Sequence, residues 1–110
     1  MRISVTFRNL DSSDALKDYA NQKLGKVEKY FDTATDADVV LRKEKHRQIA
    51  EVSLSSGPFK VNCTEETDDM YQSIDLVSDK VERQVKRQRE KIRSTKTRKS
   101  DLEKKDVSSI

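Results

Sequence analysis

The chain has 110 residues, of which 39% are charged and 33% hydrophobic, and its net charge is +3. This length and hydrophobic content predict one domain with one modest core. The single cysteine, Cys63, excludes an intramolecular disulfide and fits a reducing compartment. No apolar run approaches the roughly 18 residues of a membrane span. The N-terminus also lacks the apolar core of a signal peptide, so we expect a soluble intracellular protein.

The charge is spread unevenly along the chain. Residues 80–99 contain ten Lys or Arg and two Glu, a local charge of +8, which leaves −5 for the remainder because the total is +3. This asymmetry predicts a polyanion-binding end on an acidic body.

The N-terminal third predicts a strand followed by a helix. Residues 2–8 alternate between apolar and polar side chains, as in a strand with one buried face. Ser13 is the expected N-cap of a helix that runs to about Phe31. Gly25 inside this helix costs up to about 1 kcal/mol relative to Ala, which we interpret as a sign of close packing. The apolar stripe of the helix comprises Leu16, Ala20, Leu24, Val27 and Phe31.

The middle of the chain predicts three further strands. Residues 37–45, 49–55 and 59–63 alternate in the same way. The basic segment 42–47 is expected to enter a hairpin turn, and residues 55–58, Ser-Ser-Gly-Pro, form a second turn.

A long amphipathic helix is predicted over residues 69–93. Acidic residues at 65–69 are expected to lie at its N-terminal end, where they suit the helix dipole. Gln88 fills the one gap in its core-facing stripe. That stripe comprises Met70, Ile74, Val77, Val81, Val85 and Ile92.

These elements predict an α+β fold, a two-layer sandwich with the order β-α-β-β-β-α. The helix between the first two strands allows them to be parallel, and the short turns make the remaining pairs antiparallel. Both helices have one apolar stripe, so both can pack on one face of a four-stranded mixed sheet. We expect residues 1–93 to form this domain, and residues 94–110 to form a disordered tail or a truncated linker.

Cations flank the apolar stripe on both helices. Such a run on one isolated helix is more often an ordinary solvated face. Two helices with matching flanks, packed side by side, predict a shared basic groove. The cations of the first helix are accompanied by Tyr19 and Tyr30, which are either packing residues or stacking partners for bases. The two sets are Lys23, Lys26 and Lys29 on the first helix, and Lys80, Arg83, Arg87 and Lys91, here called the basic ridge, on the second.

Catalytic signatures are weak in this sequence. The acidic cluster at residues 65–69 matches no calcium-loop spacing. His46 has no identifiable catalytic partner, and Cys63 alternates with inward-facing residues. With no glycine-rich phosphate loop, we expect a protein that is not an enzyme and has no cofactor or metal. The basic groove and the likeness of the element order to an α-β-β-β-α double-stranded-RNA-binding module predict a structured-RNA binder.

The sequence also resembles the family of ribosome hibernation-promoting factors and ribosome-associated inhibitors. The resemblance covers residues 1 to about 93. Short motifs in the two helices and the second strand carry it: Lys-Leu-Gly-Lys-Val-Glu-Lys-Tyr-Phe-Asp at 23–32, Val-Val-Leu at 39–41, Lys-Glu-Lys at 43–45, Asp-Met-Tyr at 69–71, Ile-Asp at 74–75, Asp-Lys at 79–80 and Arg-Gln at 83–84.

This resemblance implies a bacterial cytoplasmic protein, with the plastid stroma as the alternative. It implies binding to 16S-type rRNA of the small ribosomal subunit, in the channel for mRNA and tRNA, so that the protein competes with both and inhibits translation in stress or stationary phase. Off the ribosome we expect a monomer, without membrane contact. The cations that the resemblance implies for RNA binding are Lys23, Lys26, Lys29, Lys80, Arg83 and Lys86. Of these, Lys86 lies off the basic ridge. To these we add the ridge residues Arg87 and Lys91 and the neighbouring Arg89 as expected RNA-binding residues.

Three alternatives stay open at this point. One is a general structured-RNA-binding protein or RNA chaperone that works away from the decoding channel. Another is a metal-dependent nuclease that uses the acidic cluster. The third concerns length: long-form members of the family continue into a second domain that pairs two ribosomes, so a chain ending at Ile110 is either a short form or part of a long form.

Overall fold

The computed structural model describes residues 1–31 and 34–97, with side chains in the last helix described as far as Gln88. The sheet order is β1-β2-β3-β4, with β1 parallel to β2 and the other two pairs antiparallel. The elements are β1 (Arg2–Arg8), α1 (Asp14–Gly25), the 3-10 turn η1 (Glu28–Tyr30), β2 (Asp36–Glu44), β3 (Arg47–Ser56), β4 (Phe59–Thr67) and α2 (Met70–Thr97). The predicted order and the mixed sheet are therefore confirmed.

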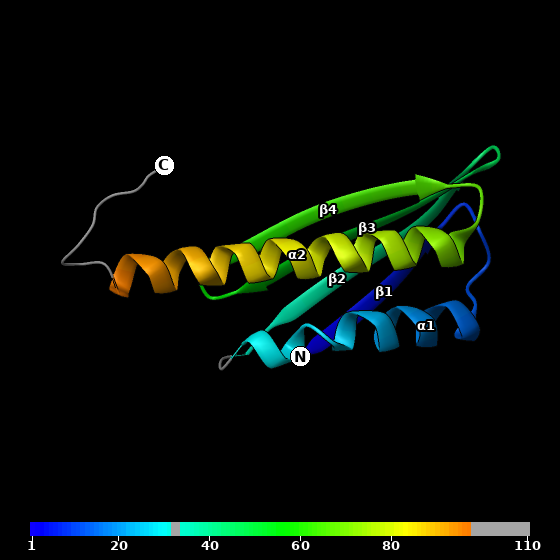
Figure 1. Ribbon diagram of the computed structural model, residues 1–110. Coiled ribbons are helices and arrows are strands. Elements are labelled where there is room, and N and C mark those ends of the chain that lie inside the picture. The colour runs from blue at the N-terminus through cyan, green and yellow to red at the C-terminus, as the bar shows by residue number, and fades with distance from the viewer. Residues whose placement is uncertain (32–33, 98–110) are drawn as a thin grey trace.

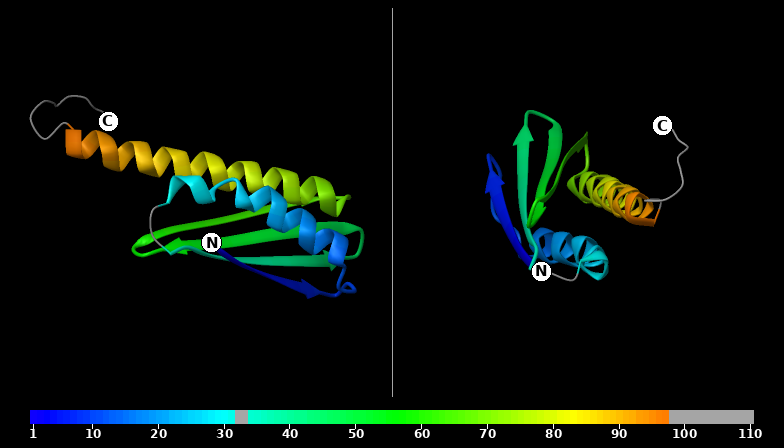
Figure 2. Two further views of the ribbon diagram at one scale, coloured as in Figure 1. Left: turned by 90° about the horizontal axis from the view of Figure 1, so that it is seen from below. Right: turned by 90° about the vertical axis from the view of Figure 1, so that its left-hand side faces the viewer.

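Both helices lie on the same face of the sheet, as Figure 1 shows. Seen end-on in Figure 2, they run side by side, with α2 over β3 and β4 and α1 toward β1. The C-terminal turns of α2, drawn in orange, extend past the sheet. The predicted two-layer sandwich is what the chain forms.

The predicted apolar stripes meet between the two layers. On α1, Ala20 and Leu24 are at most 1% exposed, and Val27 beyond the helix is fully buried. Ile92 lies outside the described side chains. The buried residues of α2 are Met70, Ile74, Val77, Val81 and Val85, and those of the sheet include Val39, Leu41, Val52, Leu54, Val61 and Cys63. Removal of this apolar surface from water is the main force that holds the helices on the sheet.

Each helix begins with a side-chain cap. The Ser13 hydroxyl accepts a hydrogen bond from the backbone N–H of Leu16 at 3.2 Å, which confirms the predicted N-cap of α1. At α2, the Asp69 carboxylate accepts from the backbone N–H of Tyr71 at 3.0 Å. These bonds satisfy helix donors that otherwise lack partners.

The first helix is shorter than the sequence predicts. It ends at Gly25 rather than Phe31, and the chain tightens into η1 through hydrogen bonds three residues apart, from Val27 N to Leu24 O and from Tyr30 N to Val27 O. A Cβ at Gly25 would have no atom within 4 Å, so the expected close packing there is wrong. The low helix propensity of glycine favours the end of the helix at this position.

Three other boundaries differ from the prediction by two residues or more. Strand β3 begins at Arg47, two residues early, because Lys45 turns the chain at φ +59° and Glu44 then pairs directly with Arg47. Residues 65 and 66 belong to β4 and not to the helix N-terminus. Helix α2 continues to Thr97, four residues into the expected tail; residues 98–110 lie outside the described residues.

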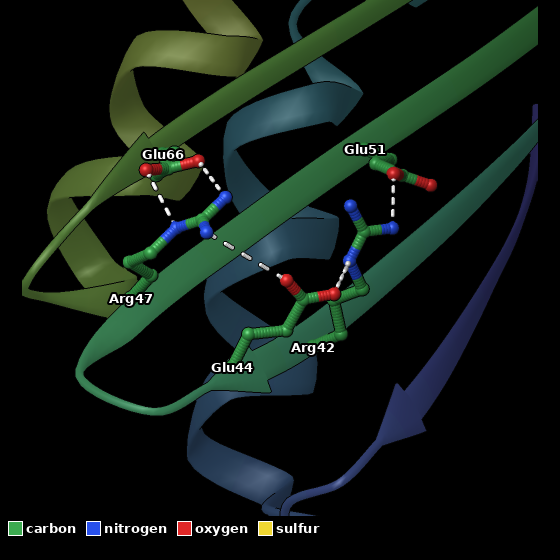
Figure 3. Close-up of polar contacts among 5 residues, drawn as sticks. All are labelled: Arg42, Glu44, Arg47, Glu51 and Glu66. Carbon is green, nitrogen blue, oxygen red and sulfur yellow. Dashed lines mark hydrogen bonds and ion pairs between the residues drawn. The ribbon is translucent and has the colours of Figure 1, made fainter.

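The sheet face opposite the helices is polar, as predicted, and a charge network crosses three of its strands (Figure 3). Arg42 contacts Glu51 and also Glu44, which lies 3.4 Å from its Nε. Arg47 donates two hydrogen bonds to Glu66, at 2.8 and 2.9 Å. These two arginines and three glutamates give this network a net charge of −1. It therefore has no excess positive charge to attract a polyanion.

Candidate nucleic-acid interface

The basic ridge of α2 lines a hollow on the outer flank of the helix. Lys80, Arg83, Gln84 and Arg87 surround a volume of about 240 Å³. They follow one another at helical steps of three, one and three, which places them on one side of α2 while its buried stripe anchors the other. The ridge is therefore held in place by the core.

The hollow contains one internal ion pair. Lys80 Nζ lies 3.3 Å from Glu65 Oε2 on β4, which places this flank of α2 beside the edge strand of the sheet. Within the described part of the chain, no carboxylate lies within ion-pair distance of Arg83 or Arg87, and both side chains are exposed. The guanidinium groups are thus the available charges of the hollow. Guanidinium is also the side chain best suited to bidentate phosphate binding.

The opposite flank of α2 is acidic and contacts the cations at the end of α1, Lys23 in the helix and Lys26 at its C-cap. Lys26 Nζ lies 2.8 Å from Asp79 and 3.4 Å from Glu82, and Lys23 Nζ lies 3.4 Å from Asp75. We call Asp75, Asp79 and Glu82 the acidic seam. The expected shared groove, in which the two basic flanks meet, is therefore wrong: the flank of α1 meets the acidic seam, and the basic ridge faces the other way.

Two tyrosines complete this contact between the helices. The Tyr19 hydroxyl donates to Asp75 at 2.6 Å, and the Tyr30 hydroxyl donates to Glu82 at 3.0 Å. The Tyr19 ring also makes an edge contact with Tyr71, with centroids 4.9 Å apart. Both phenols thus join α1 and η1 to α2, which favours the packing interpretation of Tyr19 and Tyr30.

The pKa values of these groups follow from the contacts across the seam. The hydrogen bond to Asp79 raises the pKa of Lys26 above its ordinary value and lowers the pKa of Asp79. The hydrogen bond to Asp75 raises the pKa of Tyr19 to about 12. Burial alone would raise the pKa of Glu82, but the hydrogen bond from Tyr30 and the charge of Lys26 outweigh it, so the pKa is lowered. At neutral pH Asp79 and Glu82 are therefore negatively charged, Lys26 is positively charged and Tyr19 is neutral. In these forms the groups attract one another.

The remaining predicted cations lie at different places on the helical layer. Lys29 is exposed, with its ammonium 5.4 Å from the centroid of the Tyr30 ring. Lys86 is exposed and follows Glu82 by four residues, so it continues the seam flank of α2 rather than the ridge. Arg89 and Lys91 lie outside the described side chains.

Sequence reasoning missed the role of the acidic seam. Its members are spaced by four and three residues, which is one helix flank, and the cations of α1 are spaced by three. This complementarity was a usable signal for the flank of α2 that contacts α1.

The remaining candidate groups are the acidic cluster at residues 65–69, His46 and Cys63. Glu65 and Glu66 pair with Lys80 and Arg47, and among the described residues no group of three His, Cys, Asp or Glu side chains is placed to hold a metal ion. His46 is exposed in the β2–β3 turn. Cys63 is buried, which raises the pKa of its thiol. None of the helices in residues 1–31 and 34–97 is long and apolar enough to span a membrane.

The chain is similar to several known proteins over most of its length. The family model described as "Sigma 54 modulation protein / S30EA ribosomal protein" matches residues 3–93. A ribosome hibernation promoting factor of Azotobacter vinelandii is 36% identical over 91 residues, covering 83% of this chain and 85% of that protein. The N-terminal domain of Thermus thermophilus Protein Y matches with a TM-score of 0.74 and 34% identity, covering 79% of this chain and 98% of that one. A ribosomal subunit interface protein of Coxiella burnetii matches with a TM-score of 0.75 and 26% identity, covering 82% and 99% of the two chains.

Proposed function

Because the chain belongs to the Sigma 54 modulation protein / S30EA ribosomal protein family, we propose that it binds rRNA of the small ribosomal subunit in the channel for mRNA and tRNA and thereby inhibits translation. The family is one of ribosome hibernation and ribosome binding, and it makes the chain a non-enzymatic protein. Its place of action is the cytoplasm, where ribosomes work.

The hollow on α2 is the observation that carries this proposal. Arg83 and Arg87 present exposed guanidinium groups on a helix anchored by the core, and Lys80, which is paired with Glu65, adds an ammonium to the lining of the hollow. Prearranged cations bind phosphates with little ordering cost, and phosphate contacts supply most of the affinity of such interfaces. The neutralised opposite face of the sheet favours docking through the helical layer.

Each cation of the interface has a distinct expected role. Arg83 and Arg87 contact phosphate directly, and Lys86 on the seam flank of α2 and Lys29 on η1 extend the surface toward α1. Lys23 and Lys26 reach phosphate only in competition with the acidic seam. Arg89 and Lys91 remain proposed contacts by position on α2 alone.

Sedimentation with ribosomes on a sucrose gradient tests the proposal. We expect the protein to migrate with the small subunit, and to be displaced by tRNA bound with mRNA. In vitro translation with added protein should fall over the same concentration range. Binding that resists tRNA and leaves translation intact would instead favour a general structured-RNA-binding protein or RNA chaperone.

A further inference from the structure

We propose that the acidic seam, Asp75, Asp79 and Glu82, is a selectivity element that withholds the ammonium groups of α1 from unstructured polyanions. The inference rests on the proposed function, because it concerns which RNA that same surface accepts. It assigns a role to three carboxylates that are not themselves contacts for phosphate.

The charge balance at the seam is the first step. Two ammonium groups, of Lys23 and Lys26, lie within 3.4 Å of three carboxylates. These five groups sum to −1, so the ion pairs of the seam themselves offer a phosphate no net attraction. The cations closest to the line between the helices are already neutralised within the protein.

The exposure of these groups makes the pairing reversible. The Asp79 side chain is 61% exposed and that of Lys26 is 33% exposed, so water and solutes reach the pair. Exposed ion pairs are weak, and an exchange of partners shifts an equilibrium constant by about two- to fivefold. A phosphate can therefore replace Asp79 at Lys26, but it gains little unless other cations hold it there at the same time.

That condition distinguishes structured from flexible RNA. In a folded RNA the phosphates are fixed relative to one another. When one phosphate binds Arg83 and Arg87 in the hollow, a second phosphate is therefore already held over α1, and the RNA needs no further ordering. A flexible strand loses conformational entropy for each additional contact. The seam thus lowers affinity for flexible strands more than for a preorganised RNA surface.

The substitution Asp79→Asn tests the seam directly, with a fluorescently labelled mixed-sequence single-stranded RNA as the probe. Asparagine keeps the size of the side chain and removes its charge. We expect the dissociation constant for this RNA to fall about two- to fivefold. We also expect the plot of log affinity against log salt to steepen by about 0.7, the contribution of one more phosphate contact on a single strand.

The control for net charge is Asp38→Asn. Asp38 is exposed on the opposite face of the sheet, where it pairs in register with Ser4 and Ser53. The change in total charge is identical to that in Asp79→Asn, so a seam effect must exceed it. Equal tightening in both variants overturns the inference, as does an Asp79→Asn variant that binds no tighter than wild type.

Two further variants separate the seam from a general effect on folding. Asp79→Glu keeps the charge and should bind as wild type does. Adding Lys26→Gln to Asp79→Asn should remove both the gain in affinity and the added salt dependence, and persistence of the gain without Lys26 counts against the mechanism. Sedimentation of the wild-type protein with ribosomes decides the proposed function separately, so the two can fail independently.

Discussion

The Lys26 ammonium donates a 2.8 Å hydrogen bond to Asp79, a residue 53 positions later in the chain, across the line where α1 and α2 lie side by side. This bond marks the charge layout of the helical layer. Packing of both helices on one sheet places one basic flank against the acidic seam and leaves the other, on the far side of α2, facing solvent. The predictions below depend on that layout or on the core beneath it.

The buried stripe of α2 can be tested by a matched pair of charge insertions. Val81 is fully buried, whereas Gln88 is only partly buried on the same stripe. Val81→Asp should destabilise the fold by about 3 kcal/mol or more, because it buries an unpaired charge. Gln88→Asp should cost less than about 1 kcal/mol. Urea unfolding followed by circular dichroism measures both, and equal losses would show that the helix face is misassigned.

Gly25 offers a stabilising substitution. No atom lies within 4 Å of the position a Cβ would occupy, and the backbone there is not in the left-handed region. Gly25→Ala should therefore raise the free energy of unfolding by about 0.4–1 kcal/mol, since alanine restricts the unfolded chain. A loss of stability in thermal melts would mean that the glycine is required for the turn into η1.

The hollow on α2 predicts a loss of function without a loss of fold. Neutralising it with Arg83→Gln and Arg87→Gln should weaken ribosome binding at least about tenfold, because charge-assisted bonds to phosphate are lost. The control pair is Arg8→Gln with Lys60→Gln, both exposed on the open face of the sheet, with the same change in net charge. Ribosome sedimentation and in vitro translation measure the effect of each double variant. Equal effects of the two pairs would show that the hollow is not the binding surface.

Charge reversal at Lys26, unlike neutralisation in the hollow, should change the stability of the domain. Lys26→Glu would place a third carboxylate beside Asp79 and Glu82, so the domain itself should become less stable. For this reason neutralisation in the hollow is the cleaner test of binding, and a Lys26→Glu variant that melts with the wild type would show that the seam contributes nothing to stability.

Salt dependence provides a test that needs no variant. If the three cations of the hollow contact phosphates, log affinity for ribosomes should fall against log salt with a slope of about −2 to −3 from these contacts alone. Sedimentation at a series of potassium chloride concentrations gives the slope. A flat response would point to an apolar or protein-mediated contact.

Stability should fall in acid, because the pKa values of Asp79 and Glu66 are lowered in the folded state by Lys26 and Arg47. A carboxyl with a lowered pKa stabilises the fold above its unfolded pKa, near 4, and that contribution is lost as the pH falls through the folded value. Unfolding in urea from about pH 6 to about pH 2 should show this decline. Asp79→Asn should flatten it in part; an unchanged profile would contradict the pairing.

The fold was largely determined by local sequence patterns. Alternation identified the strands, and helical steps of three and four identified both stripes, because burial of one face imposes its period on any element that packs on a core. The family motifs pointed to ribosome hibernation in the same way, since they are contiguous in the chain. The end of α1 at Gly25 and the start of β3 at Arg47 were missed, because those boundaries depend on single hydrogen bonds in turns.

The direction of each charged flank was decided by the tertiary structure alone. The sequence separates the acids of α2 from its basic ridge, but it does not say which of these two flanks lies against α1. Packing of both helices on one sheet decided this, because it brought Lys26 within 2.8 Å of Asp79 and turned Arg83 and Arg87 away from α1. Electrostatic pairing acts over a few ångströms, so it becomes visible only once residues distant in the chain have been placed side by side.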